Sequence, residues 1–237
     1  MGRGLPHGRA PAEGAQVTSI KAITDRAAFI RANTRLLTPP LVPEVRLHLA
    51  EESLPIWQRT EEELGEEGLP PPFWAFAWAG GQALARYVLD HPEIVRANRV
   101  LDLAAGSGLV AIASMRAGAM SAVAAEIDAF AIEAIRLNAE VNGMAIEAVE
   151  ADLLLGAVPT ADLILVGDLF YEKPLAERAL AWLRRCRLAG RDVLIGDPGR
   201  SYLPKEALEA IAHYEVPVTR ELEDAEIKRT AVWRLKN

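Results

Sequence analysis

Hydrophobic and polar positions follow two alternating patterns from residue 99 onwards. Short apolar runs bounded by polar residues or glycine are followed by longer segments in which apolar residues recur every three or four positions. The runs predict strands, the longer segments predict helices, and their alternation is typical of a parallel sheet with crossover helices. The predicted strands are 99–105, 121–127, 145–152, 162–170 and 192–197, and the predicted helices are 108–118, 129–143, 175–188 and 204–214.

The last part of the chain has a different pattern. Segments 215–222 and 229–235 resemble strands, and the polar residues between them do not predict a helix. They therefore predict an antiparallel pair that closes one edge of the sheet. The expected fold class is α/β: a Rossmann-like, mostly parallel seven-strand sheet with helices on both faces, an antiparallel C-terminal strand pair and a small N-terminal helical and strand extension.

Shorter elements precede this alternating region. Residues 24–37 place apolar residues among polar ones and predict a helix, which the prolines of residues 38–43 end. Residues 44–50 alternate apolar and polar side chains and predict a short strand with one apolar face. The acidic residues 59–68 predict a solvated connection between these elements and the rest of the chain.

An aromatic cluster follows a run of prolines at residues 70–72. Its members are Phe73, Trp74, Phe76 and Trp78. Aromatic side chains at this density are typical of a core, but Trp78 lies next to a double glycine and could also border a ligand pocket. We expect Gly80 and Gly81 to form a turn and a helix to begin near Gln82.

Length and composition predict one well-buried domain. The chain has 237 residues, of which 51% are hydrophobic, and no apolar run approaches the ~20 residues that span a bilayer. Residues 1–18 combine Gly, Pro and Ala with a few charges and lack the apolar core of a secretion signal, which predicts a disordered tail. We expect an N-terminal extension at 19–71, the main domain at 72–237, and a cytoplasmic protein without a membrane partner.

Charge and cysteine content narrow the function classes. The net charge of −7 and the pI near 5.3 argue against a protein that binds nucleic acid by neutralising phosphates. Cys186 is the only cysteine, so no internal disulfide or multi-thiolate metal site can form within the chain. It lies in a helical pattern, which favours a packing role. The four histidines lack the spacing of a metal-binding pair, and we predict no metal.

The stretch "VLDLAAGSGL", residues 100–109, is typical of a buried strand that breaks into a glycine turn. Such turns bring backbone close to a ligand at the carboxyl end of a strand. Residues 106–111 satisfy G-x-G-x-x-G/A, and Glu126 follows Gly106 at the end of the next predicted strand, where an acid can accept both ribose hydroxyls. The pattern fits a nicotinamide dinucleotide and S-adenosylmethionine equally.

Asp102 discriminates between the two ligands. It places a carboxylate on the loop side of the first strand, where a dinucleotide would bring its anionic pyrophosphate. S-adenosylmethionine presents a sulfonium and an ammonium instead, so an acid nearby is favourable, and we expect Asp102 to face the methionine end of this cofactor. The alternative is a carboxylate that only caps the amides of its own loop.

The segment after the predicted strand 162–170 is the expected substrate position. Asp168, Phe170 and Tyr171 follow one another above the same edge of the sheet. An acid with neighbouring aromatic rings suits a lysine ammonium, although a guanidinium or a peptide amine could also be held. Asp168 would then align the amine for attack on the methyl group, and its alternative role is the cap of the next helix.

Four stretches together resemble one enzyme family. They are "PFWAFAWAGGQALARYVLDHPEIV", "VLDLAAGSG", "GDLFYE" and "VLIGDPGR", which lie between Pro72 and Arg200. The sequence is similar here to the electron transfer flavoprotein beta subunit lysine methyltransferases. The resemblance implies a seven-strand fold, S-adenosylmethionine as cofactor, and methylation of lysines of the flavoprotein beta subunit, which modulates electron transfer from dehydrogenases. One departure is Ala104, where seven-strand methyltransferases usually have glycine.

The resemblance also implies roles for individual residues. It gives Asp168 and Tyr171 catalytic roles on the substrate side. It places around the cofactor, beside Asp102 as argued above, Trp78, Gly106, Gly108, Glu126 and Asp152. Asp152 would hold the adenine amino group, or it could simply cap a helix. Arg200, in the turn "GDPGR", would contact an acid on the substrate protein unless the turn alone explains it, and Phe170 would help to enclose the substrate.

Three alternatives remain open from the sequence. The chain could methylate another protein, such as a ribosomal protein, because related methyltransferases share these loops. It could be an NAD-dependent oxidoreductase, although Asp102 and the lack of an evident acid for hydride transfer argue against it. It could also be a catalytically silent binding module, which an intact Asp168 argues against.

Overall fold

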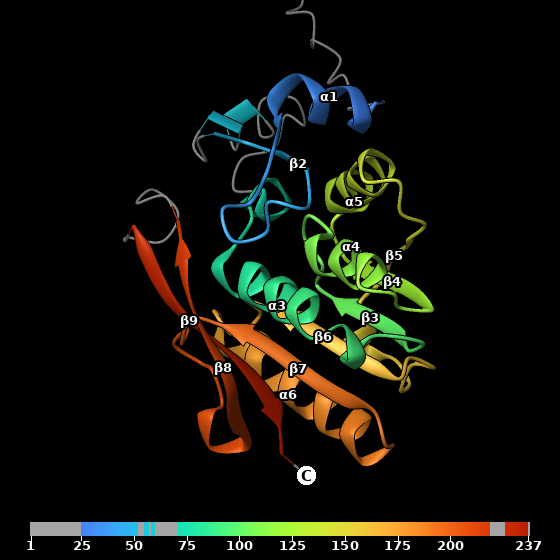
Figure 1. Cartoon of the computed structure of the whole chain (residues 1–237), viewed down its shortest axis with the longest axis vertical. Coiled ribbons are helices and arrows are strands. Elements are labelled where there is room, and N and C mark those ends of the chain that lie inside the picture. The colour runs from blue at the N-terminus through green and yellow to red at the C-terminus, as the bar shows by residue number, and fades with distance from the viewer. Residues whose placement is uncertain (1–24, 52–54, 57, 60–70, 219–225, 237) are drawn as a thin grey trace, which may run out of the picture.

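The computed structural model describes residues 25–51, 55, 56, 58, 59, 71–218 and 226–236 (Figure 1). The predicted tail at 1–18 lies outside these residues, as does nearly all of the predicted acidic connection at 59–68. The assigned limits of the extension and the main domain stay predictions.

A seven-stranded sheet forms the centre of the molecule (Figure 1). Its strands, in chain order, are β3 (Arg99–Leu103), β4 (Ser121–Glu126), β5 (Glu147–Glu150), β6 (Leu163–Gly167), β7 (Asp192–Asp197), β8 (Leu208–Pro217) and β9 (Ile227–Leu235). Their spatial order is β5-β4-β3-β6-β7-β9-β8. The first five are parallel, whereas β9 is antiparallel to both β7 and β8. The predicted fold class is therefore confirmed.

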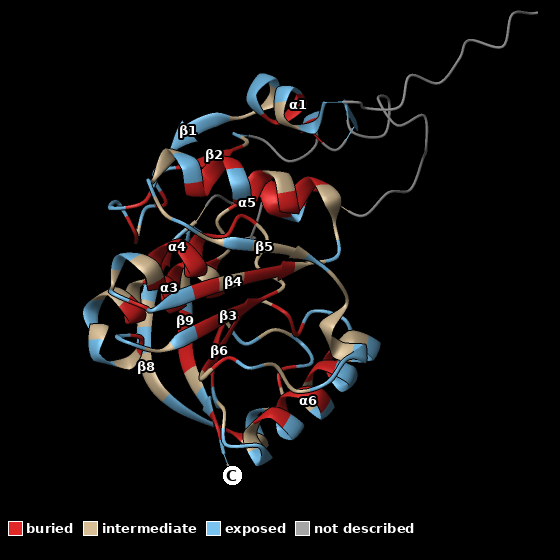
Figure 2. Cartoon of the chain, turned by 90° about the vertical axis from the view of Figure 1, so that its right-hand side faces the viewer, coloured by how far each residue is buried: buried red, intermediate tan, exposed pale blue. Residues whose placement is uncertain are grey.

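Helices cover both faces of the sheet. They are α3 (Ala79–Asp90), α4 (Leu109–Arg116), α5 (Ala129–Val141) and α6 (Lys173–Leu188). Successive residues of a strand point to opposite faces, so Leu165 packs towards α3 and α4, and its neighbour Val166 packs towards α6. The buried residues of α6 pack against the sheet, and its exposed residues lie on the outer side (Figure 2).

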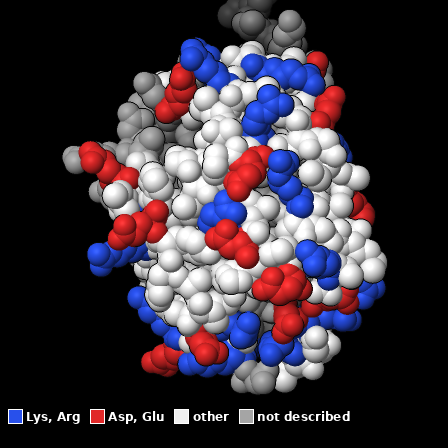
Figure 3. All heavy atoms as spheres, in the orientation of Figure 1, with Lys and Arg blue, Asp and Glu red and all other residues white. Residues whose placement is uncertain are grey.

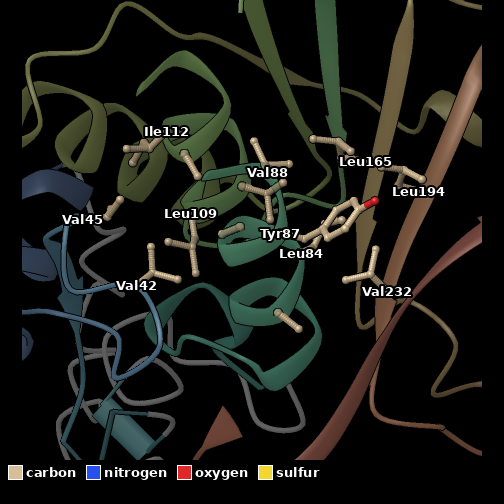
Figure 4. Close-up of a cluster of buried hydrophobic side chains, with 14 of the residues drawn as sticks. Val42, Val45, Leu84, Tyr87, Val88, Leu109, Ile112, Leu165, Leu194 and Val232 are labelled. Carbon is tan, nitrogen blue, oxygen red and sulfur yellow. The ribbon is translucent and has the colours of Figure 1, made fainter. Parts of the chain in front are cut away.

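The core between the sheet and α3 brings together distant parts of the sequence. Val88 of α3, Leu109 of α4, Leu165 of β6 and Val232 of β9 belong to one buried cluster (Figure 4). Burying aliphatic side chains of this size contributes roughly 1.5–3 kcal/mol each. On the opposite face, Cys186 is buried in the cluster under α6, and burial raises the pKa of its thiol to about 11. The predicted packing role of this cysteine fits that position.

The N-terminal extension contains a helix and a two-stranded ribbon: α1 (Arg26–Asn33), β1 (Arg35–Leu37) and β2 (Leu47–Leu49). Asp25 caps α1 by accepting a hydrogen bond from the Ala28 N–H at 2.9 Å. The helix predicted over 24–37 is too long, because the side chain of Asn33 bonds the carbonyl of Phe29, and the chain after it pairs with β2. The strand predicted within 44–50 is confirmed as β2.

A second prediction is wrong at residues 204–214. The structure has a short 3-10 helix, η4 (Lys205–Ala207), followed by strand β8 in place of the expected helix. Pairing with β9 runs from Leu208 opposite Leu235 to Pro217 opposite Ile227. This long ladder outweighs the local helical preference of a segment rich in Ala and Glu.

The extension is attached to the main sheet through α5. Asn138 of α5 accepts a hydrogen bond from the backbone N–H of His48 at 2.7 Å and donates one to the carbonyl of Ser107 at 2.8 Å. Asn138 is completely buried, so both hydrogen bonds replace contacts with water. One side chain therefore joins strand β2 to the loop that follows β3.

Two further observations concern the surface. On the face shown in Figure 3, basic and acidic side chains are interspersed. Within the residues that the structure describes, none of the helices is both long enough and apolar enough to cross a bilayer.

Candidate functional site

The carboxyl ends of β3, β4, β6 and β7 meet at one edge of the sheet, because these strands are parallel. The loops after them carry most of the residues singled out from the sequence. The N-terminus of α3 lies at the same edge, where the Gly81 N–H contacts Asp168. The candidate site therefore has a part over β3 and β4, expected to hold the cofactor, and a part over β6 and β7, expected to receive the substrate.

The turn after β3 has the backbone that its glycines predict. Gly106 and Gly108 have φ values of +52° and +77°, in the left-handed region that glycine enters without strain. Ala104 also lies there, at φ +54°. Alanine thus adopts a conformation that glycine enters more easily, and this costs about 1–2 kcal/mol.

Glu126, at the end of β4, fastens this turn. Its Oε1 accepts a hydrogen bond from the Gly106 N–H and its Oε2 accepts one from the Ile127 N–H, both at 2.9 Å. Loss of contact with water raises the pKa of Glu126, although the two backbone donors oppose the shift. Each carboxylate oxygen can accept a second hydrogen bond, so Glu126 could still bind a pair of hydroxyls.

Asp102 lies deeper, with 1% of its surface exposed. Its Oδ2 accepts a hydrogen bond from the Ala111 N–H in the first turn of α4, at 2.9 Å. Burial raises its pKa to about 7, and the negative charge of Glu126 adds to the shift. Asp102 therefore caps a backbone N–H group, which is the kind of role that the sequence left open as its alternative to binding the cofactor.

The two carboxylates provide a test of fit for a cofactor. Within the described part of the chain, neither Asp102, which is buried, nor Glu126, which is partly exposed, forms an ion pair with a basic side chain. Buried carboxylates are normally paired with a positive charge. Their environment therefore fits a cationic ligand such as a sulfonium with an ammonium, and it is unfavourable to a pyrophosphate.

Asp152 already has partners within the chain. Its Oδ1 accepts a hydrogen bond from the Leu154 N–H at 3.1 Å and caps the 3-10 helix η3 (Leu153–Leu155). Its Oδ2 is 2.5 Å from Nη2 of Arg178 on α6. These contacts correspond to the capping alternative, and the adenine role of Asp152 stays a prediction.

Asp168 directly follows the last residue of β6 and has an unusual backbone conformation. Its φ is +55°, and its backbone N–H donates to the carbonyl of Gly196 at the end of β7 at 3.0 Å. The side-chain Oδ2 accepts a hydrogen bond from the Gly81 N–H at 2.8 Å, within the first turn of α3. Asp168 thus caps α3, and the helix that follows it, α6, has Glu172 at its N-cap.

Glycines allow α3 to lie directly on these strand ends. A Cβ atom on Gly80 would be 2.2 Å from the Gly196 carbonyl oxygen and 2.6 Å from Asp168 Oδ2. Gly167 is similarly close, since its Cβ would be 3.1 Å from Gly81 Cα. The helix begins at Ala79, so the expected turn at Gly80 and Gly81 is wrong: both glycines lie inside the first turn of α3.

Arg200 reaches Asp168 from the loop after β7. Its Nη2 and Nε lie 2.7 and 3.1 Å from Asp168 Oδ1. Burial raises the pKa of Asp168 to about 6, although the positive charge of Arg200 opposes the shift. Arg200 therefore has an acidic partner within this chain, and its contact with an acid on a substrate protein stays a prediction. The guanidinium also lies over the ring of Trp78, 5.6 Å from its centroid.

An aromatic rim surrounds this ion pair. Phe73 of η1 (Phe73–Ala75) lies 5.8 Å from the ring of Trp78 and 5.5 Å from that of Tyr171. Tyr171 is 44% exposed, and burial of its other side raises its pKa, with further contributions from Glu172 and Glu126. The charge of Glu126 raises the pKa of Tyr171 and that of Arg200 lowers it.

Two expectations for aromatic residues are corrected. Phe170 is completely buried in the core under α6, so its ring cannot enclose a substrate in this structure. The chain turns sharply at Asp168, and this sends Phe170 inward and Tyr171 outward. Within the cluster after the prolines, Trp74 and Phe76 are core residues, whereas Phe73 is 37% exposed at the rim.

Sequence reasoning missed Phe73 and Asp197 as parts of the site. Asp197 is completely buried, and its Oδ1 accepts hydrogen bonds from the N–H groups of Gly199 and Arg200. The motif "DPG" before Arg200 could have revealed it, since Asp at the first position of a turn bonds the backbone two residues on. Among the described residues there is no group of three or more His, Cys, Asp or Glu side chains that could hold a metal ion.

Comparison with known proteins gives close relatives over most of the chain. The family model described as ribosomal protein L11 methyltransferase (PrmA) matches residues 82–167. Electron transfer flavoprotein beta subunit lysine methyltransferase from Xenopus laevis is 41% identical over 212 residues, or 87% of this chain and 85% of the relative. The protein of that name from Homo sapiens is 34% identical over 213 residues, or 87% and 80%.

A solved structure agrees on the fold. A candidate RNA methyltransferase from Pyrococcus horikoshii has a TM-score of 0.50 and 13% identity, and the match covers 66% of this chain and 81% of that one. A likeness at this level of identity concerns the arrangement of strands and helices alone.

Proposed function

The chain belongs to the family of electron transfer flavoprotein beta subunit lysine methyltransferases, and on this premise we propose that it methylates lysine side chains of the electron transfer flavoprotein beta subunit, with S-adenosylmethionine as the methyl donor. The observation that carries the proposal is the pairing of two environments at one edge of the sheet. Over β3 and β4 lie the buried Asp102 and the partly exposed Glu126, neither of which forms an ion pair with a basic side chain of the described residues, and a carboxylate with an aromatic rim lies over β6.

On the cofactor side, the turn at Gly106 and Gly108 allows close approach of a ligand to the backbone. Asp102 and Glu126 would offset the positive charges of the cofactor, and Glu126 would also accept its ribose hydroxyls. Trp78 would border the cofactor near the start of α3, and Asp152 would lie near the adenine. When bound, S-adenosylmethionine supplies an electrophilic methyl group on a positively charged sulfur.

On the substrate side, Asp168 would receive the lysine nitrogen and Tyr171 would line its approach. Methyl transfer needs a lone pair on that nitrogen, and a lysine with a pKa near 10.4 reaches its neutral form at pH 7 at a cost of about 4.6 kcal/mol. A positively charged donor beside the amine lowers this cost by repulsion between like charges. Asp168 orients the amine for attack along the bond that breaks, and the proton leaves to Asp168 or to water.

Methylation of the flavoprotein subunit can be measured directly. Purified protein is incubated with S-adenosylmethionine and recombinant flavoprotein beta subunit, and mass spectrometry follows the added methyl groups and locates them. We expect methylated lysines with the wild type and none with Asp168→Ala, while S-adenosylhomocysteine binds both proteins equally in calorimetry. An unmodified subunit together with undetectable binding of S-adenosylhomocysteine would contradict the proposal.

A second candidate substrate is a ribosomal protein, because residues 82–167 match the model of the ribosomal protein L11 methyltransferases. Recombinant L11 in a parallel reaction separates the two candidates. That the protein acts without nucleic acid, membrane or metal stays a prediction. Its location in the cytoplasm also stays a prediction.

A further inference from the structure

The contact between Arg200 and Asp168 goes beyond what a surface ion pair would provide. Both guanidinium donors converge on the single oxygen Oδ1, at 2.7 and 3.1 Å, while the Gly81 N–H bonds Oδ2 at 2.8 Å. The two side chains are only 18% and 11% exposed. Both oxygens of the carboxylate are therefore held, and the plane of the group is fixed relative to α3 and to the aromatic rim.

The loop that carries Arg200 is itself fixed. Asp197 Oδ1 accepts hydrogen bonds from the N–H groups of Gly199 and Arg200 at 2.6 and 2.7 Å. The Leu203 N–H donates to the Arg200 carbonyl at 3.0 Å, and the Tyr202 N–H donates to the Phe170 carbonyl at 3.2 Å. The guanidinium therefore extends from a backbone that is bonded on both sides, which limits the directions from which it can reach Asp168.

We propose that Arg200 is a positioning residue for methyl transfer: it keeps the Asp168 carboxylate charged and aimed at the incoming lysine amine. The inference rests on the proposed function, because it takes Asp168 as the group that receives the amine. Each carboxylate oxygen has two lone pairs, so Asp168 can still accept a hydrogen bond from a lysine nitrogen at its exposed side. Arg200 acts through Asp168 and takes no part in the bond that breaks.

The groups around Asp168 define what removal of Arg200 would change. Burial favours the neutral acid, and so does the negative charge of Asp197 at the end of β7. The Gly81 N–H of α3 and Arg200 favour the charged form, and the charge of Arg200 contributes most among these. Without the guanidinium, the pKa of Asp168 rises above its present value of about 6. A substrate lysine would then meet a largely neutral acid near pH 7.

Three variants test the role of Arg200. Arg200→Gln removes the charge, and Arg200→Lys keeps it on a side chain that cannot place two donors on one oxygen. Arg99→Gln is the matched control, because Arg99 makes a comparable pair with Asp162, at 2.9 and 2.7 Å, at the opposite end of the β3 and β6 strands. Circular dichroism establishes that each variant is folded.

Two measurements are made on each protein. The carboxyl carbon of Asp168 is titrated by NMR without substrate, and kcat/KM for the flavoprotein beta subunit is measured between pH 5.5 and 9. In Arg200→Gln we expect the titration midpoint and the acidic limb of kcat/KM to rise together by at least one pH unit, with a loss of kcat/KM at pH 6 of about fivefold or more. Arg200→Lys should fall between this variant and the wild type, and Arg99→Gln should match the wild type.

Other outcomes would overturn the inference. If the Asp168 midpoint is the same in Arg200→Gln and in the wild type, Arg200 does not maintain the charge of the carboxylate. If the midpoint rises while the acidic limb of kcat/KM stays in place, that charge does not matter for methyl transfer. Should Arg200→Gln fail to fold, the same comparisons apply to Arg200→Lys. Absence of wild-type turnover with a normal titration refutes the proposed function, because the NMR measurement needs no substrate.

Discussion

Replacing Gly80 by alanine tests how closely helix α3 lies on strand β7. The new Cβ atom would be 2.2 Å from the Gly196 carbonyl oxygen and 2.6 Å from Asp168 Oδ2. Real Cβ atoms essentially never come this close, so either the helix or the strand must move. Overpacking of a buried site costs about 1–3 kcal/mol, and we expect the upper end because the blocking atom belongs to the backbone of a central strand.

Gly81→Ala is the matched control. A Cβ on Gly81 meets no atom within 4 Å, and its backbone N–H still bonds Asp168. Alanine in a helix is more favourable than glycine by roughly 0.5–1 kcal/mol. For a chain of this size, 1 kcal/mol changes the melting temperature by roughly 2–4 °C.

Thermal unfolding and methylation assays on both variants give the comparison. We expect Gly80→Ala to melt roughly 6–12 °C below the wild type and Gly81→Ala to melt a few degrees above it. Methylation should fall only in Gly80→Ala, since that variant displaces Asp168. Equal melting temperatures for Gly80→Ala and the wild type would refute the close packing on which this reasoning depends.

Three further predictions follow from single side chains. Ala104→Gly should stabilise the protein by about 1 kcal/mol in urea unfolding, because it relieves a left-handed alanine at φ +54°; a loss of stability would contradict this account. Asn138→Leu should destabilise the protein by roughly 2–4 kcal/mol, because the N–H of His48 and the carbonyl of Ser107 lose their buried partner. Hydrogen exchange should also increase at residues 104–108. Unchanged exchange there would show that the hydrogen bonds of Asn138 do not hold the turn. Burial raises the pKa of Asp102 from 3.8 to about 7, so the folded protein holds this proton more tightly than the unfolded chain does. Asp102 therefore contributes stability that is fully present below about pH 4 and is lost as the pH rises towards 7. Unfolding measured at pH 5 and pH 8 should therefore show a smaller loss for Asp102→Asn than for the wild type, and equal losses would mean that Asp102 is not buried as described.

The central part of the fold could be predicted because local and global preferences agree there. The strand containing Val100 and Leu101 and the helix containing Leu109 and Ile112 are two apolar segments separated by the glycines of the turn. Strand β8 could not be predicted, because the segment itself favours a helix and its strand conformation depends on pairing with β9, the next strand along the chain. Tertiary pairing of this kind leaves no periodic signal in the segment itself.

The site was predictable as a set of residues and less so as a set of contacts. The glycine spacing identified Gly106 and Gly108, and the acids Asp102, Glu126 and Asp168 lie at the edge of the sheet where parallel strands place them. The pairing of Arg200 with Asp168 depends on how the loop after β7 folds back, which no local pattern specifies. The burial of Phe170 follows a left-handed residue at Asp168, which no local pattern predicts.

The position of β9 between β7 and β8 has a consequence for how the protein is made. Strand β8 precedes β9 in the chain, yet in the described sheet it is hydrogen-bonded to the other strands through β9 alone. During synthesis, β8 therefore leaves the ribosome before the strand that will hold it, and the edge of β7 from Leu194 to Asp197 stays open until β9 inserts. An open edge can pair with a strand of another nascent chain, so the hazard of misassembly is greatest in this interval and ends when the C-terminal strand inserts.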